Sequence, residues 1–112
     1  MPESVRVIWD DSLTHYDFGP AHPLSPIRLD LTIRLARGLG VLDGEHVELV
    51  SPAIADDALL TTVHTPEFIA AVRRATFDPT HGLGTGDNPC FDAMHEASAR
   101  VAAGSVDAAL AV

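Results

Sequence analysis

The sequence predicts an α/β protein in which helices flank a parallel β-sheet. Its predicted elements follow the order strand, helix, strand and then helices, which favours a parallel sheet over an α+β arrangement. The first predicted strand, residues 5–10, is apolar with little alternation, as expected of a strand buried on both faces. The chain ends inside or just after a long helix, where a βαβ pattern requires another strand, so the predicted sheet is incomplete.

Composition limits the chain, residues 1–112, to one globular domain at most. Of its 112 residues, 46% are hydrophobic and 21% are charged. Sixteen acidic and seven basic residues give a formal net charge of −9, which argues against a nucleic-acid partner and is expected to serve solubility. The sequence shows no signal peptide and no apolar run long enough to span a bilayer, so a cytoplasmic location without a membrane partner is expected.

The first half of the chain predicts a strand, a loop, a helix and a second strand. Residues 11–25 carry two prolines, a glycine and two histidines, so they are expected to form a long loop and a place to look for function. Ser25–Pro26 is typical of an N-cap followed by the first helical position. The helix is expected over residues 27–38, ended by glycines. Residues 47–50 form the second strand, which a Ser-Pro pair ends.

The second half begins with two predicted helices. Asp56 or Asp57 is expected to cap a short helix that runs through Val63. Thr65–Pro66 is expected to start another helix, which runs to about Thr76.

A loop rich in Gly, Pro, Asp and Thr, residues 77–89, leads into the last predicted helix. Asn88–Pro89 is expected to cap and start this helix, which places the single cysteine, Cys90, just inside it as a small buried apolar group. Glu96 and Arg100 are expected to form an i,i+4 pair. Small residues suit this helix to close docking on a sheet, and its expected apolar stripe consists of Phe91, Met94, Ser98, Val101, Ser105, Ala108 and Val112.

Arg28 breaks two local rules at once. It falls in the middle of the apolar arc of its helix, and it places a cation in the first turn, where the helix dipole disfavours positive charge. Such conflicts tend to mark functional or specially paired positions. Two interpretations stay open: the guanidinium turns back over the helix start to reach water, or it holds an acceptor within a site.

Asp87 lies in the glycine-rich stretch GLGTGDNPCF, residues 82–91. A glycine-rich turn before a helix usually holds phosphate, but a carboxylate here repels phosphate and no Walker lysine follows. The carboxylate is either a turn acceptor for the backbone two residues later, or it is presented to a partner that carries N–H donors. The six histidines show no metal-binding spacing, and His22 and His64 are expected to hydrogen-bond to the backbone.

Three motifs, in order, resemble the opening of a histone deacetylase family domain. They are Tyr16-x-x-Gly19-x-x-His22-Pro23-x-x-Pro26-x-Arg28-Leu29, then His64-Thr65-Pro66-Glu67-Phe68-Ile69, then Gly86-Asp87-Asn88-Pro89 through Gly104-Ser105. The resemblance covers nearly the whole chain and is closest to the bacterial branch, the AcuC-type acetoin utilization and acetylpolyamine amidohydrolase-like proteins. It implies an arginase/deacetylase fold, a large parallel sheet flanked by helices. It also implies hydrolysis of acyl amides on lysine or polyamine nitrogens with one zinc ion.

The resemblance implies roles for three residues. Asp87 matches the rim aspartate that accepts hydrogen bonds from substrate backbone amides. Arg28 matches the arginine at the inner end of the active-site tunnel, beside a cavity associated with the acetate product, and Tyr16 lines the same inner region. We therefore expect Arg28 and Asp87 to belong to opposite ends of one amide-holding tunnel.

The zinc ligands, the His-His general base and the transition-state tyrosine of that family lie downstream of the matched motifs. The chain is therefore expected to be an inactive N-terminal segment, truncated before the metal-binding half, with no catalytic residue, cofactor or metal of its own. Zinc and an acetylated amine or acetyl-lysine substrate are expected in the full-length domain. Two alternatives remain: a short binding or homo-oligomerising module built on the half-fold, and a small carboxylate-binding protein that uses Arg28.

Overall fold

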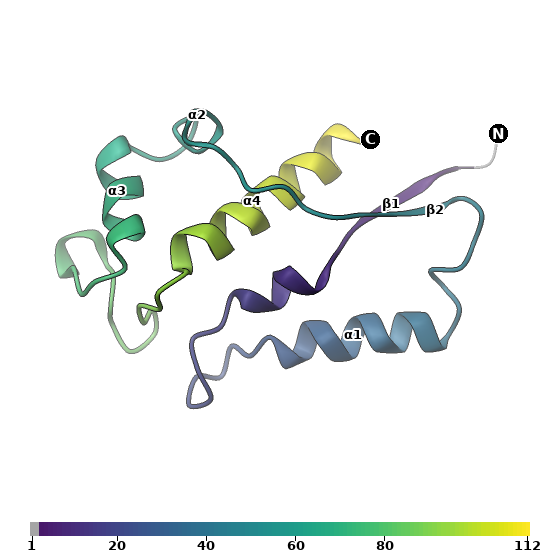
Figure 1. Cartoon of the computed structure of the whole chain (residues 1–112), viewed down its shortest axis with the longest axis horizontal. Coiled ribbons are helices and arrows are strands. Elements are labelled where there is room, and N and C mark those ends of the chain that lie inside the picture. Colours follow the sequence, from purple (N-terminus) through teal and green to yellow (C-terminus); the bar gives the residue numbers. More distant parts are fainter. Residues whose placement is uncertain (1–2) are drawn as a thin grey trace.

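The computed structural model describes residues 3–112 as strands and helices in the expected alternation (Figure 1). In chain order the elements are β1 (Val5–Ile8), the 3-10 helix η1 (Asp11–His15), α1 (Ile27–Gly38), β2 (Val47–Val50), α2 (Asp57–Leu60), α3 (Pro66–Arg74), the 3-10 helix η2 (Pro79–His81) and α4 (Met94–Leu110). The α/β class is confirmed.

The sheet consists of β1 and β2, which pair in parallel. Val5 lies opposite Val47 and Ile8 opposite Val50, and between these pairs the Arg6 guanidinium lies 3.2 Å from the Glu48 carboxylate. The expectation that the first strand is buried on both faces is wrong for this chain, because the β1 side chains are exposed or only half-buried. Helices flank the pair without covering it fully (Figure 1).

α4 packs closely against β1 because it presents very small side chains. A Cβ atom added to Gly104 would lie 3.3 Å from Cγ2 of Ile8 and 3.7 Å from Cβ of Pro52. The predicted close docking of this helix on the sheet is therefore confirmed, and Arg100 pairs with Glu96 at 3.2 Å as expected.

The buried face of α4 differs from the predicted apolar stripe. Val101, Ser105 and Ala108 are exposed. The buried residues of α4 are Met94, Ala97, Ala99, Ala103 and Gly104. The predicted stripe is therefore confirmed at Met94 and wrong from Val101 onward, where close approach to the strand selects the smallest residues rather than the most hydrophobic ones.

α4 also begins later than the Asn88–Pro89 pair predicted. Its first residue is Met94. The Asn88 side chain instead donates a hydrogen bond through Nδ2 to the carbonyl of Gly82 at 2.9 Å, which closes the preceding loop. Cys90 consequently lies before the helix, half-buried against an apolar cluster that includes Leu83.

The remaining predicted boundaries hold to within a few residues. α1 has the expected bounds, although Pro26 rather than Ser25 occupies its N-cap position. α2 ends at Leu60 instead of Val63 and is capped by Asp56, whose carboxylate accepts from the N–H of Leu59. The predicted loop over residues 11–25 contains η1, which the Asp10 carboxylate caps by accepting from the N–H of Ser12.

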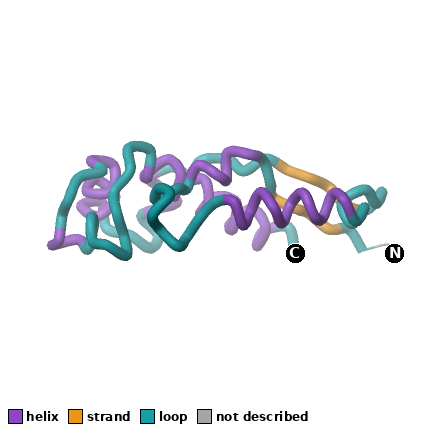
Figure 2. Tube along the Cα trace, turned by 90° about the horizontal axis from the view of Figure 1, so that it is seen from below, coloured by secondary structure: helices purple, strands orange, loops and turns teal. Residues whose placement is uncertain are grey.

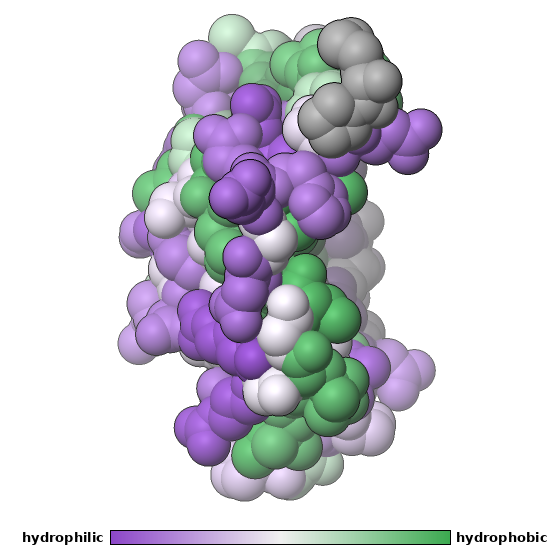
Figure 3. All heavy atoms as spheres, turned by 90° about the vertical axis from the view of Figure 1, so that its right-hand side faces the viewer, coloured by the Kyte–Doolittle hydropathy of each residue, from purple (hydrophilic) through white to green (hydrophobic). Residues whose placement is uncertain are grey.

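The described chain is flat, with principal extents of 50 × 33 × 16 Å (Figure 2). Hydrophobic side chains reach the surface on the face of the molecule shown in Figure 3, and one side of α1 is exposed to solvent. This α1 apolar face consists of Ile27, Leu31, Leu35 and Leu39, which are between 56% and 68% exposed. Among residues 3–112, no helix is long and apolar enough to cross a membrane.

Candidate functional site

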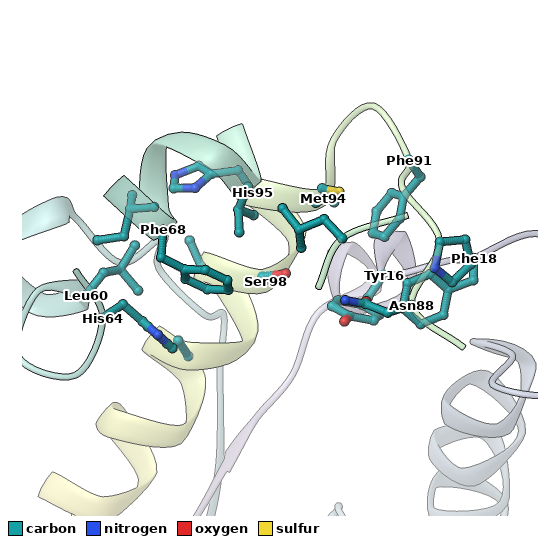
Figure 4. Close-up of a pocket in the computed structure, with 16 residues that line it drawn as sticks. Tyr16, Phe18, Leu60, His64, Phe68, Asn88, Phe91, Met94, His95 and Ser98 are labelled. Carbon is teal, nitrogen blue, oxygen red and sulfur yellow. The ribbon is translucent and has the colours of Figure 1, made fainter. Parts of the chain in front are cut away.

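An apolar pocket with a volume of about 230 Å³ lies between α2, α3, α4 and two loops (Figure 4). Leu60, His64 and Phe68 form one side, the loop residues form the other, and Met94 and Ser98 of α4 lie between them. The loop residues include Tyr16, Phe18, Asn88 and Phe91. A concave, mostly aromatic and aliphatic lining with few polar groups is typical of a small-molecule pocket.

Tyr16, one of the three predicted site residues, lines this pocket and is half-buried. Its ring meets Phe18 edge-on with centroids 5.2 Å apart, and Phe91 in the same manner at 5.6 Å. Tyr16 follows η1 at the carboxyl end of β1, the end of a parallel strand at which ligand sites usually lie.

The glycine-rich loop beside the pocket is held by its own backbone. Gly84 donates to the carbonyl of Asn88 at 2.9 Å, and the N–H of Asn88 donates to the carbonyl of Thr85 at 3.2 Å. Gly84 has φ +89°, and a Cβ there would approach Cδ2 of Phe77 to 2.8 Å, so the turn requires glycine.

Asp87 is exposed within this loop, next to Asn88, a lining residue of the pocket. In an Asx turn the Asp87 carboxylate would accept from the backbone N–H two residues later. That residue is Pro89, which has no N–H, so the turn-acceptor interpretation is wrong. Among residues 3–112, no hydrogen bond or ion pair engages the Asp87 carboxylate. The carboxylate is therefore available to an external donor.

His22 joins the loop before α1 to the glycine-rich loop. Its Nε2 lies 3.2 Å from the carbonyl oxygen of Asp87, and its Nδ1 accepts from the N–H of Leu24 at 3.0 Å. The predicted backbone bonding of His22 is confirmed. The corresponding prediction for His64 is wrong within the described residues, since its ring instead lies against Phe68 with centroids 5.2 Å apart.

Arg28 does not line the pocket. It is exposed in the first turn of α1, beside Ile27 of the α1 apolar face. No ion pair engages its guanidinium within the part of the chain that the structure describes. This chain therefore brings Tyr16 and the Asp87 loop together at one pocket, while Arg28 and Asp87 both lie on exposed surface outside its lining.

A charged cluster that no sequence motif indicates borders the pocket. Arg73 of α3 donates to both carboxylate oxygens of Asp57, at 3.1 and 2.6 Å, and its Nη2 lies 3.1 Å from Nε2 of His95, a lining residue. The hydrogen bond from Arg73 lowers the pKa of Asp57, and burial together with the Arg73 charge lowers the pKa of His95. No local motif joins these positions, so only the packing of three helices reveals the cluster.

The described residues do not offer a zinc site. Across residues 3–112, no group of three or more His, Cys, Asp and Glu side chains lies close enough together to hold a metal ion.

Comparison with known proteins gives a consistent set of relatives. No family model matches the chain. It is 32% identical to acetoin utilization protein AcuC of Staphylococcus xylosus, over 97% of this chain and 30% of the relative. It is 33% identical to AcuC of Bacillus subtilis, over 91% of this chain and 28% of the relative. It is 30% identical to histone deacetylase clr6 of Schizosaccharomyces pombe, over 96% of this chain and 28% of the relative. The chain thus spans about 30% of the length of the curated relatives it matches.

Proposed function

The chain belongs to the histone deacetylase family, and from that premise we propose that it is the N-terminal, substrate-holding part of a zinc-dependent deacylase domain. The proposed substrates are acyl amides of lysine or polyamine type, such as acetyl-lysine. The observation that carries the proposal is the unused Asp87 carboxylate on a fixed loop at the edge of an apolar pocket.

Asp87 is proposed to accept hydrogen bonds from N–H groups of the substrate. An ionised carboxylate forms hydrogen bonds with N–H donors that are about twice as strong as those between neutral groups. Its position next to Asn88 places the acceptor at the edge of the pocket. The aromatic side chains of Tyr16 and Phe18 then offer apolar surface to the substrate.

Arg28 is proposed to hold a carboxylate product such as acetate, in a site that further chain completes. The exposed α1 apolar face supports this proposal, since four large side chains more than half exposed form a surface suited to cover by another layer.

Catalysis is assigned to residues outside this chain, because residues 3–112 hold no set of zinc ligands. The purified 112-residue chain is expected to show no hydrolysis of acetyl-lysine peptides and no stoichiometric zinc by elemental analysis. Measurable turnover together with one tightly bound zinc would overturn the assignment.

The role of Asp87 is tested by steady-state kinetics of the full-length protein. Asp87→Ala is expected to raise KM for acyl-lysine substrates by roughly tenfold, the loss of about 1.5 kcal/mol from a charged hydrogen bond, with a smaller change in kcat. Asp92→Ala, at an exposed position five residues later, is the control and should leave KM unchanged. An unchanged KM in Asp87→Ala would remove the substrate role.

A second candidate function is a non-catalytic module that covers the α1 apolar face by self-association. The exposure of that face is the observation that favours it. Light scattering of the purified chain separates the two candidates. A folded oligomer of defined mass favours the module, whereas aggregation or a loosely packed species favours a part of a larger domain.

A further inference from the structure

We propose that His22 is a positioning residue that fixes the Asp87 loop at the pocket edge through a hydrogen bond from its Nε2–H to the Asp87 carbonyl. The contact measures 3.2 Å and joins residues 65 positions apart. Its functional consequence rests on the proposed role of Asp87 as the acceptor for substrate amides. The hydrogen bond itself rests only on geometry.

The two hydrogen bonds of the His22 ring determine its tautomer. The N–H of Leu24 is a donor and lies 3.0 Å from Nδ1, so Nδ1 must be the acceptor. A neutral imidazole with an acceptor at Nδ1 carries its hydrogen on Nε2. That nitrogen faces the Asp87 carbonyl oxygen, which can only accept. Both contacts therefore require the same protonation pattern.

Aromatic packing holds the His22 ring in this orientation. Its centroid lies 4.6 Å from that of Phe18, and Phe18 in turn packs edge-on against Phe91 at 5.7 Å. Phe18 and Phe91 both line the pocket and are seen together beside Asn88 (Figure 4). The ring is therefore fixed by the same residues that form one wall of the site.

The hydrogen bond from His22 adds to the internal bonds of a loop whose glycines adopt conformations that other residues rarely take. Gly82 and Gly84 have positive φ values of +71° and +89°, and a Cβ added to Gly86 would meet nothing within 4 Å. The bonds of Asn88 fix the loop internally. Asp78 pairs with Leu83 at the start of the loop, and Leu83 is buried against α3 and α4. Farther along the loop, His22 is the partner found within residues 3–112 for the Asp87 carbonyl, so it ties this part of the loop to the segment before α1.

Two substitutions separate the hydrogen bond of His22 from its packing. His22→Gln keeps an amide N–H donor near the position of Nε2 and loses the ring. His22→Phe keeps the ring against Phe18 and loses both nitrogens. His15→Gln, at an exposed position in η1, is the matched control.

The first measurement is nitrogen-15 NMR of the His22 ring in the full-length protein. We expect the hydrogen on Nε2 and an unprotonated Nδ1. Hydrogen on Nδ1 would overturn the proposal without any variant. The second is hydrogen exchange at the N–H groups of Gly84 and Asn88, which are bonded within the loop. His22→Phe should speed their exchange by roughly fivefold, while His22→Gln and His15→Gln should leave it near the original rate.

Kinetics of the full-length protein then connect the loop to the substrate. His22→Phe is expected to raise KM for acyl-lysine substrates several-fold with kcat nearly unchanged, and His22→Gln to restore it. Unchanged exchange and KM in His22→Phe, with a raised KM in Asp87→Ala, would overturn the positioning role and leave the proposed function standing. Faster exchange in His22→Phe, with KM unaltered in both His22→Phe and Asp87→Ala, would instead overturn the function proposed for Asp87. The hydrogen bond that fixes the loop would then stand.

Discussion

Arg73 holds Asp57 by two hydrogen bonds, at 3.1 and 2.6 Å, and so joins the last turn of α3 to the first turn of α2. The bidentate arrangement is the favoured geometry of guanidinium and carboxylate groups. Because Arg73 also contacts His95 of α4, one guanidinium links three helices around the pocket. The cluster gives this part of the molecule a defined dependence on pH.

Substitution of Asp57 is expected to remove part of the acid sensitivity of the fold. The pKa of Asp57 is lowered in the folded protein by the hydrogen bond from Arg73, so its contribution to stability is present above the unfolded-state pKa and is lost as pH falls. Asp57→Asn should therefore be less stable than the original protein near pH 7, and the difference should shrink below about pH 4. Urea unfolding at several pH values measures this. Glu45→Gln, at an exposed position, is the control.

His95 is expected to destabilise the fold on mild acidification. Burial and the neighbouring Arg73 charge lower the pKa of His95, so between its folded and unfolded pKa values the unfolded chain binds more protons. Stability should accordingly fall as pH falls below about 6.5. His95→Gln should flatten unfolding curves recorded between pH 7.5 and 5.5, whereas an unaltered slope would show that another group is responsible.

Two Pro-containing pairs show where sequence reasoning succeeds and where it fails. Thr65–Pro66 starts α3 as predicted, because the Thr65 hydroxyl accepts from the N–H of Phe68 at 3.2 Å. Asn88–Pro89 presents a similar pattern and starts no helix; the Asn88 side chain instead donates through Nδ2 to the carbonyl of Gly82, six residues earlier. A capping residue starts a helix when its side-chain oxygen accepts from the N–H groups of the first turn, as that of Thr65 does, and the residue type alone does not show this.

Some residues of the candidate site are likewise predicted from the sequence, and others are not. Tyr16 is predicted by its motif and lines the pocket, and the chemical availability of the Asp87 carboxylate follows from sequence once Pro89 is considered. The Arg73 cluster is not predictable in this way, since it joins residues 16 and 22 positions apart that share no motif. The shared tunnel expected for Arg28 and Asp87 stays a prediction, because this chain leaves both residues exposed.

Gly104 is expected to tolerate no larger side chain. Its Cβ position lies 3.3 Å from Ile8 on β1, so Gly104→Val should force α4 away from the strand at a cost of about 1–3 kcal/mol. Gly38→Ala is the matched comparison, because a Cβ there meets nothing within 4 Å and the substitution should stabilise α1 by about 0.5–1 kcal/mol. Chemical denaturation measures whether each substitution lowers or raises the free energy of unfolding. A neutral Gly104→Val would contradict the close docking of α4.

The α1 apolar face permits a comparison between the isolated chain and the full-length protein. Leu35 is 63% exposed here, so Leu35→Gln should change the stability of the isolated 112-residue chain by less than about 0.5 kcal/mol. If further chain covers α1, as proposed, the same substitution in the full-length protein places an amide in a core and should cost about 2–5 kcal/mol, as for truncation of a buried leucine.

Arg37→Gln, on the polar side of α1, is the control and should be nearly neutral in both settings. A neutral Leu35→Gln in the full-length protein would show that the face stays open to solvent and would contradict the proposed covering layer. A destabilised isolated chain whose unfolding midpoint depends on protein concentration would instead identify a second copy as the cover, because only an oligomer links stability to concentration.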